Sequence, residues 1–239
     1  ILIKQNFISN KKLIIFIIII YSFCIFISGE KTAFFNYILL NFILSVIFYK
    51  KKYIKYSLIF TLFILSVFII SPSIKFEQKY QNTIDRYIKV EMFNQEKLVL
   101  FSKTYQNHYV SAYQIFRSYP VFGSGLKSFR KICLKPKFNP SGCATHPHNV
   151  MMHFLSELGL IGTFFYLFTL SYFGIKIVRL FFDKFRKKKQ IESSSLEVIF
   201  IVSIFVSLSP FSPSGSFFNN WLSILFFLQI SFYMHFKKD

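Results

Sequence analysis

Residues 145–162 read Thr-His-Pro-His-Asn-Val-Met-Met-His-Phe-Leu-Ser-Glu-Leu-Gly-Leu-Ile-Gly. Two histidines and a carboxamide therefore stand directly before a mostly apolar run. Pro147 favours an extended conformation at His146 and suits the first position of a helix. We expect His146 to be the N-cap of a helix that starts here and His148 to lie in its first turn. Free backbone N–H groups at this helix end would offer an anion-binding site beside a neutral imidazole.

The composition predicts an all-α integral membrane protein. The chain has 239 residues, of which 53% are hydrophobic and 21% aromatic, yet its net charge is +19. An ordinary soluble domain does not combine these values. Several apolar runs approach the roughly 20 residues that a helix needs to cross a bilayer. The expected transmembrane helices, about six in number, cover residues 13–28, 33–49, 54–70, 150–175, 196–211 and 217–236.

Lysine and arginine clusters predict the topology. Such clusters occur before span one, between spans two and three, after span four and at the end of the chain. With six spans, all four clusters fall on one side of the membrane, which should be the cytoplasm. Residues 1–71 then hold three transmembrane helices, 72–149 form one large loop on the side opposite the cytoplasm, and 150–239 hold three more helices. The loop has twelve Lys and Arg against four Asp and Glu, so we expect it to attract anionic ligands or anionic membrane lipid.

Within the loop, aromatic residues at helical spacing predict one or two amphipathic helices over residues 85–118. Pro120 and the sequence Gly123-Ser-Gly125 should end this region in a turn. We expect His108 to lie on the surface of the helix. Cys133 and Cys143 are ten residues apart, so a disulfide is expected if the loop faces an oxidising compartment. A zinc site with the nearby histidines is the alternative, but the spacing matches no common zinc pattern, and we expect no metal.

Several familiar catalytic patterns do not occur in the sequence. There is no Asp-x-Asp pair, no Walker loop, no Gly-x-Gly-x-x-Gly fingerprint and no closely spaced carboxylate pair in the large loop. A metal-dependent nucleotide-sugar transferase or a glycosidase would normally need such acids. Histidines, arginines and hydroxyls instead suit proton transfer with anion binding, without a metal or cofactor. A glycan carried on a polyprenyl diphosphate fits this chemistry, and a nucleic-acid partner is not expected.

Two motifs resemble one bacterial family. His148-Asn149, nine residues, Gly159, two residues and Gly162 resemble the signature of the O-antigen ligase and polymerase family, and residues 119–125 resemble its proline–glycine turn. The resemblance covers about residues 86–162. It implies an inner-membrane glycosyltransferase with one large periplasmic loop, which moves glycan from undecaprenyl diphosphate to a lipid core or another acceptor glycan. Family members usually have ten or more spans, so we expect the chain to be the C-terminal portion of a longer protein.

The resemblance also assigns candidate site residues. The essential loop histidine of the family corresponds to His148, the expected general base. The family's loop arginine is most simply matched by Arg86, with Arg117 as second candidate and Arg130 as a weaker third. We expect the substrate-binding residues to be Arg86, Arg117, His146 and Asn149.

The apolar segment itself contains ionisable residues. His153 and Glu157 share one helical face, which we expect to point away from His148; they are either functional or a buried pair that ties this helix to a neighbour. Gly159 and Gly162 should serve close helix packing. For the whole protein, the alternatives are a transporter or exporter of lipid-linked glycan and a non-catalytic scaffold or fragment. These residues do not separate ligase from polymerase.

Overall fold

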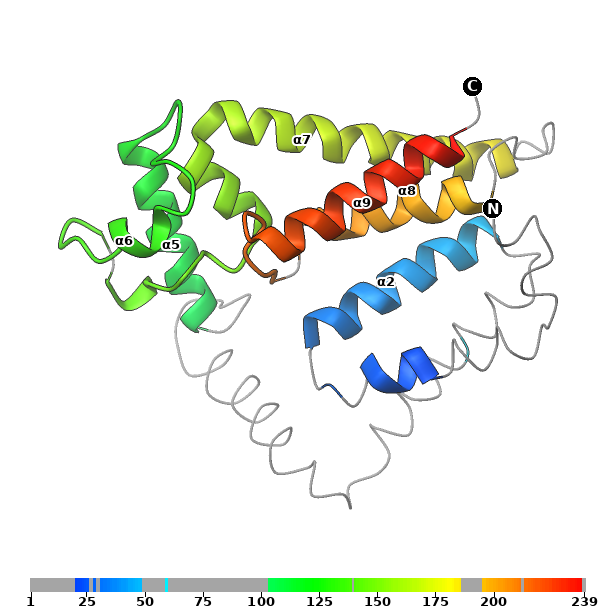
Figure 1. Ribbon diagram of the computed structural model, residues 1–239, viewed down its shortest axis with the longest axis horizontal. Coiled ribbons are helices and arrows are strands. Elements are labelled where there is room, and N and C mark those ends of the chain that lie inside the picture. Colours follow the sequence, from blue (N-terminus) through cyan, green and yellow to red (C-terminus); the bar gives the residue numbers. More distant parts are fainter. Residues whose placement is uncertain are drawn as a thin grey trace, which may run out of the picture. The chain divides into compact units, whose positions relative to one another are not determined.

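A computed structural model describes residues 20–25, 28, 31–48, 59, 103–138, 140–185, 195–211 and 213–237. All regular secondary structure in these ranges is helical (Figure 1). The prediction of an all-α fold is therefore confirmed for the described residues. The chain divides into two compact units, which are Ile1–Ser71 with Val178–Glu192 and Pro72–Ile177 with Ser193–Asp239.

The first unit contains helix α2, Lys31–Ile47. It agrees with the predicted span at 33–49. Asn41 donates a side-chain hydrogen bond to the carbonyl of Tyr37 (2.8 Å), and the Tyr37 hydroxyl bonds to the Ser22 hydroxyl (2.5 Å), so the polar groups of this apolar helix are paired. The predicted span at 54–70, apart from Ile59, and most of the one at 13–28 lie outside the described residues.

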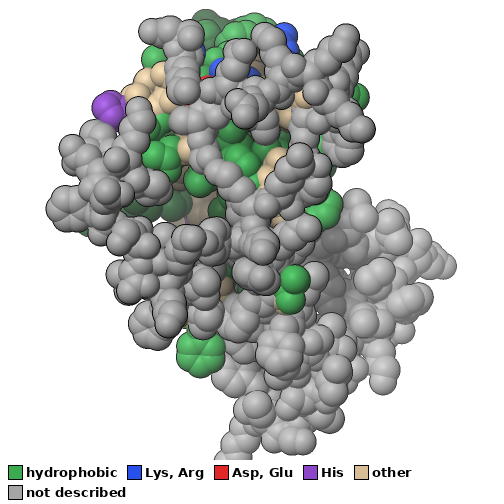
Figure 2. All heavy atoms as spheres, turned by 90° about the vertical axis from the view of Figure 1, so that its right-hand side faces the viewer, with side chains coloured by type: hydrophobic (Ala, Val, Ile, Leu, Met, Phe, Trp, Pro, Cys, Tyr) green, Lys and Arg blue, Asp and Glu red, His purple; other side chains and the backbone are tan. Residues whose placement is uncertain are grey.

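The second unit contains the apolar helices α8, Ser195–Ser207, and α9, Asn220–Phe236, and α7, Val150–Phe185, up to Ile177. Hydrophobic side chains predominate among the described residues on the face shown in Figure 2. Among the described residues, one segment, Val150–Asp183, is long and apolar enough to cross a membrane. The apolar helices Thr32–Ile47 and Leu196–Ser207 are shorter.

Aromatic contacts and one hydrogen bond pack these three helices together. The Tyr166 hydroxyl of α7 donates to the carbonyl of Leu208, just after α8 (2.8 Å). The ring of Phe173 meets that of Tyr233 on α9 at 5.3 Å between centroids. A phenylalanine pair stacks α8 on α9. The α8–α9 connection reaches the start of α7, where Asn149 donates to the carbonyl of Pro210 and Ser214 N donates to the carbonyl of His148.

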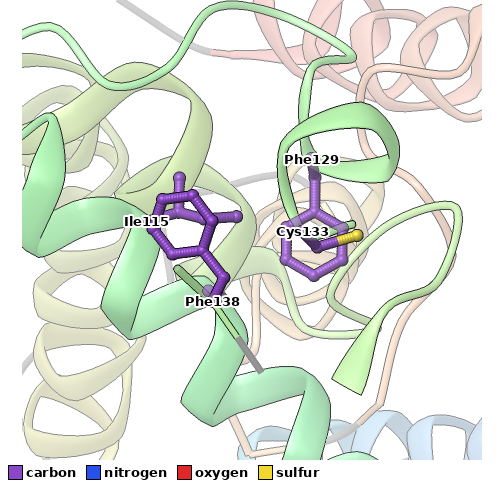
Figure 3. Packing of buried hydrophobic residues seen from close by; sticks show 5 residues of the cluster. Ile115, Phe129, Cys133 and Phe138 are labelled. Atoms are coloured by element: carbon purple, nitrogen blue, oxygen red, sulfur yellow. The ribbon is translucent and has the colours of Figure 1, made fainter. Parts of the chain in front are cut away.

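The large loop contributes a small second core. It contains α5 (Lys103–Ser118), the short α6 (Phe129–Ile132) and the 3₁₀ turn η2 (Pro140–Gly142). The helix end at Ser118 agrees with the prediction, and the predicted helical part 85–102 lies outside the described residues. Figure 3 shows the buried cluster that joins these elements; it consists of Ala112, Ile115, Phe129, Cys133 and Phe138. Cys133 and Cys143, for which the sequence left both a disulfide and a zinc site open, form a disulfide that fastens the segment before the histidines to this core.

Helix α7 is broken at Gly159. Its 36 residues would extend about 54 Å as one rod, well beyond what a bilayer requires. Gly159 has φ 62° and ψ −156°, which is not helical. The break separates a nine-residue arm, 150–158, from a long segment, 160–185, that runs in a different direction (Figure 1). The prediction of one continuous rod from Val150 is therefore wrong, because apolar periodicity continues across the break and gives no sign of it.

The turn at 119–125 closes this break. Its N–H groups satisfy the last free carbonyls of the arm, and its carbonyls satisfy the first free N–H groups of the long segment. Unpaired backbone groups at two helix ends would otherwise cost free energy in an apolar environment. The four hydrogen bonds, donor first, are Ser124 N to Ser156 O (3.0 Å), Gly125 N to Glu157 O (3.0 Å), Leu160 N to Pro120 O (2.8 Å) and Ile161 N to Val121 O (3.3 Å).

Glycine is needed on both sides of this contact. A Cβ on Gly159 would lie 2.5 Å from the backbone nitrogen of Gly123, and a Cβ on Gly123 would lie 2.3 Å from the carbonyl carbon of Glu157. Both glycines also have positive φ angles, which residues with a side chain rarely adopt. The predicted role of Gly159 in helix packing is thus replaced by a more specific one: it allows the break and the close approach of the turn.

Replacing Gly159 with alanine should destabilise the fold strongly. Backbone strain and the clash with the turn together should cost about 2–5 kcal/mol. Gly174→Ala is a matched control in the same helix, since its Cβ would meet only the side chain of Phe205, at 3.3 Å. Thermal unfolding of both variants in lipid nanodiscs measures the difference. Equal melting temperatures for the two variants would contradict the described break.

Candidate functional site

The imidazole of His148 lies in a cage of three other rings. The ring centroid of His146 is 4.0 Å away, that of His108 is 5.2 Å away and that of Tyr105 is 5.6 Å away. His108 and Tyr105 come from α5, whereas His146 and His148 precede α7. The site therefore forms only when the loop packs against the start of the arm, and we call these four residues the ring cluster.

The backbone around the ring cluster differs from the prediction. Helix α7 begins at Val150, and the residue that caps it is Asn149, whose Oδ1 accepts a hydrogen bond from Met152 N at 3.1 Å. His146 is not the N-cap, and His148 is not in the first turn. His148 has φ 55°, a left-handed conformation that is incompatible with an α-helix, so the helix can start only after it. Non-glycine residues in this conformation are uncommon and gather at functional sites.

Hydrogen bonds fix the protonation pattern of two histidines. His108 Nδ1 lies 2.8 Å from the carbonyl oxygen of Gly142, and a carbonyl only accepts, so this nitrogen carries the proton. His146 Nε2 likewise donates to the carbonyl of Ser214 at 3.2 Å. In neutral His146 the other ring nitrogen, Nδ1, then accepts from the Thr145 hydroxyl at 2.9 Å. His108 is buried, so the prediction that it lies on the surface is wrong.

His148 is the histidine of the ring cluster whose ring nitrogens make no hydrogen bond within the part of the chain that is described. Its side chain is partly exposed. Burial, and then the nearby His108, lower the pKa of His148 below its usual value. Burial, and then His148, lower the pKa of His146 to about 4. Both imidazoles are therefore neutral at neutral pH, and His148 keeps a nitrogen lone pair that can accept a proton.

The α8–α9 connection holds the backbone of the ring cluster in place. The Ser214 N–H donates to the carbonyl of His148 at 2.9 Å, and the Asn149 side-chain amide donates to the carbonyl of Pro210 at 2.8 Å. Both ends of the Asn149 amide are thus used in structural hydrogen bonds. Its predicted contact with substrate stays a prediction.

His153 and Glu157 form a buried pair that points toward the ring cluster. His153 Nε2 lies 3.3 Å from Glu157 Oε2, and the His153 ring is 6.1 Å from that of His146. The prediction that this face points away from His148 stays a prediction, since the ring that His153 approaches is that of His146. The Glu157 carboxylate also accepts the N–H groups of Lys127 (2.6 Å) and Phe129 (3.0 Å), so it ties the arm to the loop at α6.

Of the predicted arginines, the two that the structure describes, Arg117 and Arg130, are exposed on α5 and α6. Arg86 lies outside the described residues. Arg117 is exposed near the end of α5, nine residues or about 13 Å along the helix from His108. In the described ranges, no group of three or more His, Cys, Asp or Glu could hold a metal ion.

Three contributors to the site, Tyr105, His108 and Ser214, were not among the predicted site residues. Tyr105 and His108 are three residues apart and therefore share one face of α5, which was a usable signal. The buried face of α5 continues from these two residues to Ala112 and Ile115. It is therefore not the face that the aromatic spacing had indicated. Ser214 acts through its backbone, so its side-chain type carried no signal.

The low pKa of His146 predicts an acid-sensitive fold. Between its ordinary pKa of about 6.5 and its folded pKa of about 4, the unfolded chain binds a proton that the folded chain does not. This contribution therefore destabilises the fold as the pH falls through that window and is absent above it. His146→Gln keeps a donor for the carbonyl of Ser214, but glutamine does not titrate. The melting temperature of this variant should therefore fall less between pH 7 and pH 4.5 than that of the original protein. The same change at exposed His235 is the control; an equal fall in all three proteins would contradict the assignment.

His108 should influence the titration of His148. In His108→Asn the amide nitrogen can still donate to Gly142, but the neighbouring imidazole is lost. Because His108 lowers the pKa of His148, this variant should raise it. Histidine NMR titration in nanodiscs measures the change, with His235→Asn as control. A His148 pKa that stays the same, or falls, in His108→Asn would refute the predicted coupling.

The sequence that forms this site matches a known protein family. The family described as O-antigen ligase matches residues 16–167, which include the turn, the break and all four members of the ring cluster. No curated protein matches the chain, and no solved structure does. The match covers more than half of the 239 residues. The chain therefore belongs to the O-antigen ligase family, bacterial inner-membrane glycosyltransferases of lipopolysaccharide biosynthesis that act on lipid-linked glycans.

Proposed function

We propose that this protein transfers a glycan from undecaprenyl diphosphate to a sugar hydroxyl, with His148 as the general base. The observation that carries the proposal is the state of His148. It is neutral, partly accessible and without a hydrogen-bond partner among the described residues, whereas His146 and His108 both use ring nitrogens to bind backbone carbonyls. A base must offer a lone pair to the proton that it removes.

The proposed step is a single displacement. His148 takes the proton from the acceptor hydroxyl, and the oxygen attacks the anomeric carbon of the donor glycan. The bond from that carbon to the diphosphate oxygen breaks, and undecaprenyl diphosphate leaves with the electron pair. Attack from the face opposite the leaving group inverts the anomeric configuration. Neither a metal ion nor a cofactor takes part in this proposal.

The departing diphosphate needs positive charge. Residues 103–149 contain seven Lys and Arg and no Asp or Glu, which supports an anion-binding role for this part of the loop. We assign the leaving group to Arg86 and Arg117, whose guanidinium groups can each bind phosphate oxygens in a bidentate manner. His146 and Asn149 hold His148 in position through the bonds described above and border the acceptor.

The membrane setting completes the proposal. Six spans would place the loop 72–149 in the periplasm, between helices 1–71 and 150–239, on the side where lipid-linked glycans and lipid-core or glycan acceptors meet. The disulfide between Cys133 and Cys143 supports this side, because structural disulfides persist in the oxidising periplasm. The partners are then the diphosphate-linked glycan, the acceptor and membrane lipid.

His148→Gly separates the chemical role from a structural one. Glycine accepts the positive φ of this position, so the fold should remain, while product formation should fall by about 100-fold or more. Added imidazole should restore part of the activity by replacing the missing base. Transfer of labelled lipid-linked glycan to acceptor, followed in nanodiscs or in cells that lack the native enzyme, measures both effects.

His235→Gly, at an exposed position on α9, is the matched control and should retain activity. Undiminished transfer by a folded His148→Gly protein would refute the proposed base. Movement of intact lipid-linked glycan across the bilayer, with no product formed by the unmodified protein, would favour an exporter instead.

A further inference from the structure

The turn that closes the break in α7 exposes large apolar side chains. Val121 is 48% exposed, Phe122 is 76% exposed and Leu126 is 61% exposed. The backbone of the turn is fixed by its bonds to α7, so these side chains are held outward rather than left free to collapse onto the loop core. Such a concentration of exposed apolar groups in a few residues usually marks a contact surface.

This apolar surface continues onto α7. The N–H groups of Leu160 and Ile161 bond to the turn, and their side chains are 55% and 44% exposed. Phe164 and Phe165, one turn further along, are also exposed. These residues lie within Val150–Asp183, the candidate membrane span, and begin its long part after the break at Gly159. The exposed side chains of the turn therefore join the face that this segment would present to lipid.

Basic residues follow directly after the apolar residues of the turn. Lys127, Arg130 and Lys131 are all exposed, and residues 103–149 contain no Asp or Glu. The Glu157 carboxylate meets the backbone of this segment, but it is fully buried and paired with His153. Apolar side chains beside cations are the combination that binds the interface of an anionic bilayer. The apolar groups enter the boundary of the acyl chains, and the cations meet lipid phosphates.

We propose that the turn 119–125, together with Leu126, is a membrane anchor that inserts into the anionic outer face of the bilayer, with Lys127, Arg130 and Lys131 at the lipid headgroups. The arm 150–158 starts from this anchor, because Ser156 and Glu157 bond to the turn. The anchor thereby sets the depth of the arm and of the ring cluster at its far end, about 13 Å away along the helix. This inference does not depend on the proposed reaction.

The test places a fluorescent reporter in the anchor. The chain has one tryptophan, Trp221. In a Trp221→Phe background, Phe122→Trp should insert into vesicles that contain phosphatidylglycerol. Lipids brominated near the top of the acyl chains should quench about half or more of its emission, because interfacial segments bury their apolar side ~5–10 Å deep. Lys135→Trp, at an exposed site beyond α6, is the control and should be quenched little.

Charge is tested in the same assay. The triple change Lys127→Gln, Arg130→Gln and Lys131→Gln, or replacement of phosphatidylglycerol by phosphatidylcholine, should lower the quenching of the Phe122→Trp reporter at least twofold. Equal quenching in neutral and anionic vesicles would overturn the anionic surface as the partner. Insertion would be overturned if the brominated lipids did not quench the reporter. It would also be overturned if quenching were lost on raising the protein-to-lipid ratio, because a second copy of the protein would then cover the surface. Quenching relieved by added polyprenyl phosphate would assign the surface to a polyprenyl chain instead.

Discussion

Four backbone hydrogen bonds between the turn 119–125 and the two ends of broken α7 are the constraint on which the rest of the structure depends. A helix that stops and restarts leaves carbonyls on one side and N–H groups on the other without partners. Here the same short turn satisfies both sets. Since each unpaired group would be costly near lipid, the break and the turn require one another.

The break gives the histidine site its position. Because α7 changes direction at Gly159, the arm 150–158 is free to run beside the loop instead of continuing along the axis of the long segment. His148 therefore packs against α5 and the α8–α9 connection, rather than facing lipid at the end of a rod. Glu157 adds a second link, because its buried carboxylate binds the loop at α6 from within the arm.

Parts of this arrangement could be predicted from the sequence. Pro120, Gly123 and Gly125 indicated a turn by composition alone, and two nearby cysteines indicated a disulfide. The family resemblance rested on the spacing from His148 to Gly159, which the structure explains as the length of the arm. In each case the signal was local, because a turn or a fixed spacing depends on residues close in sequence.

Other parts depended on tertiary contacts and could not be predicted. A single glycine in an apolar helix is usually tolerated, so Gly159 did not reveal a break until its neighbours in space were known. His108 resembled a surface histidine on an amphipathic helix until Gly142 was found as its acceptor. The arginine assignment rests on the resemblance alone: Arg117 lies well along α5 from His108, and Arg86 lies outside the described residues.

The distance across the break tests this account most directly. Spin labels at Met151 on the arm and at exposed Phe168 on the long segment can be measured by electron paramagnetic resonance in nanodiscs. Seventeen residues of continuous helix would separate the two positions by about 25 Å along the axis. A clearly shorter distance is the result expected from the bend at Gly159. A narrow distribution at the distance of a straight helix would contradict the break and, with it, the described position of His148.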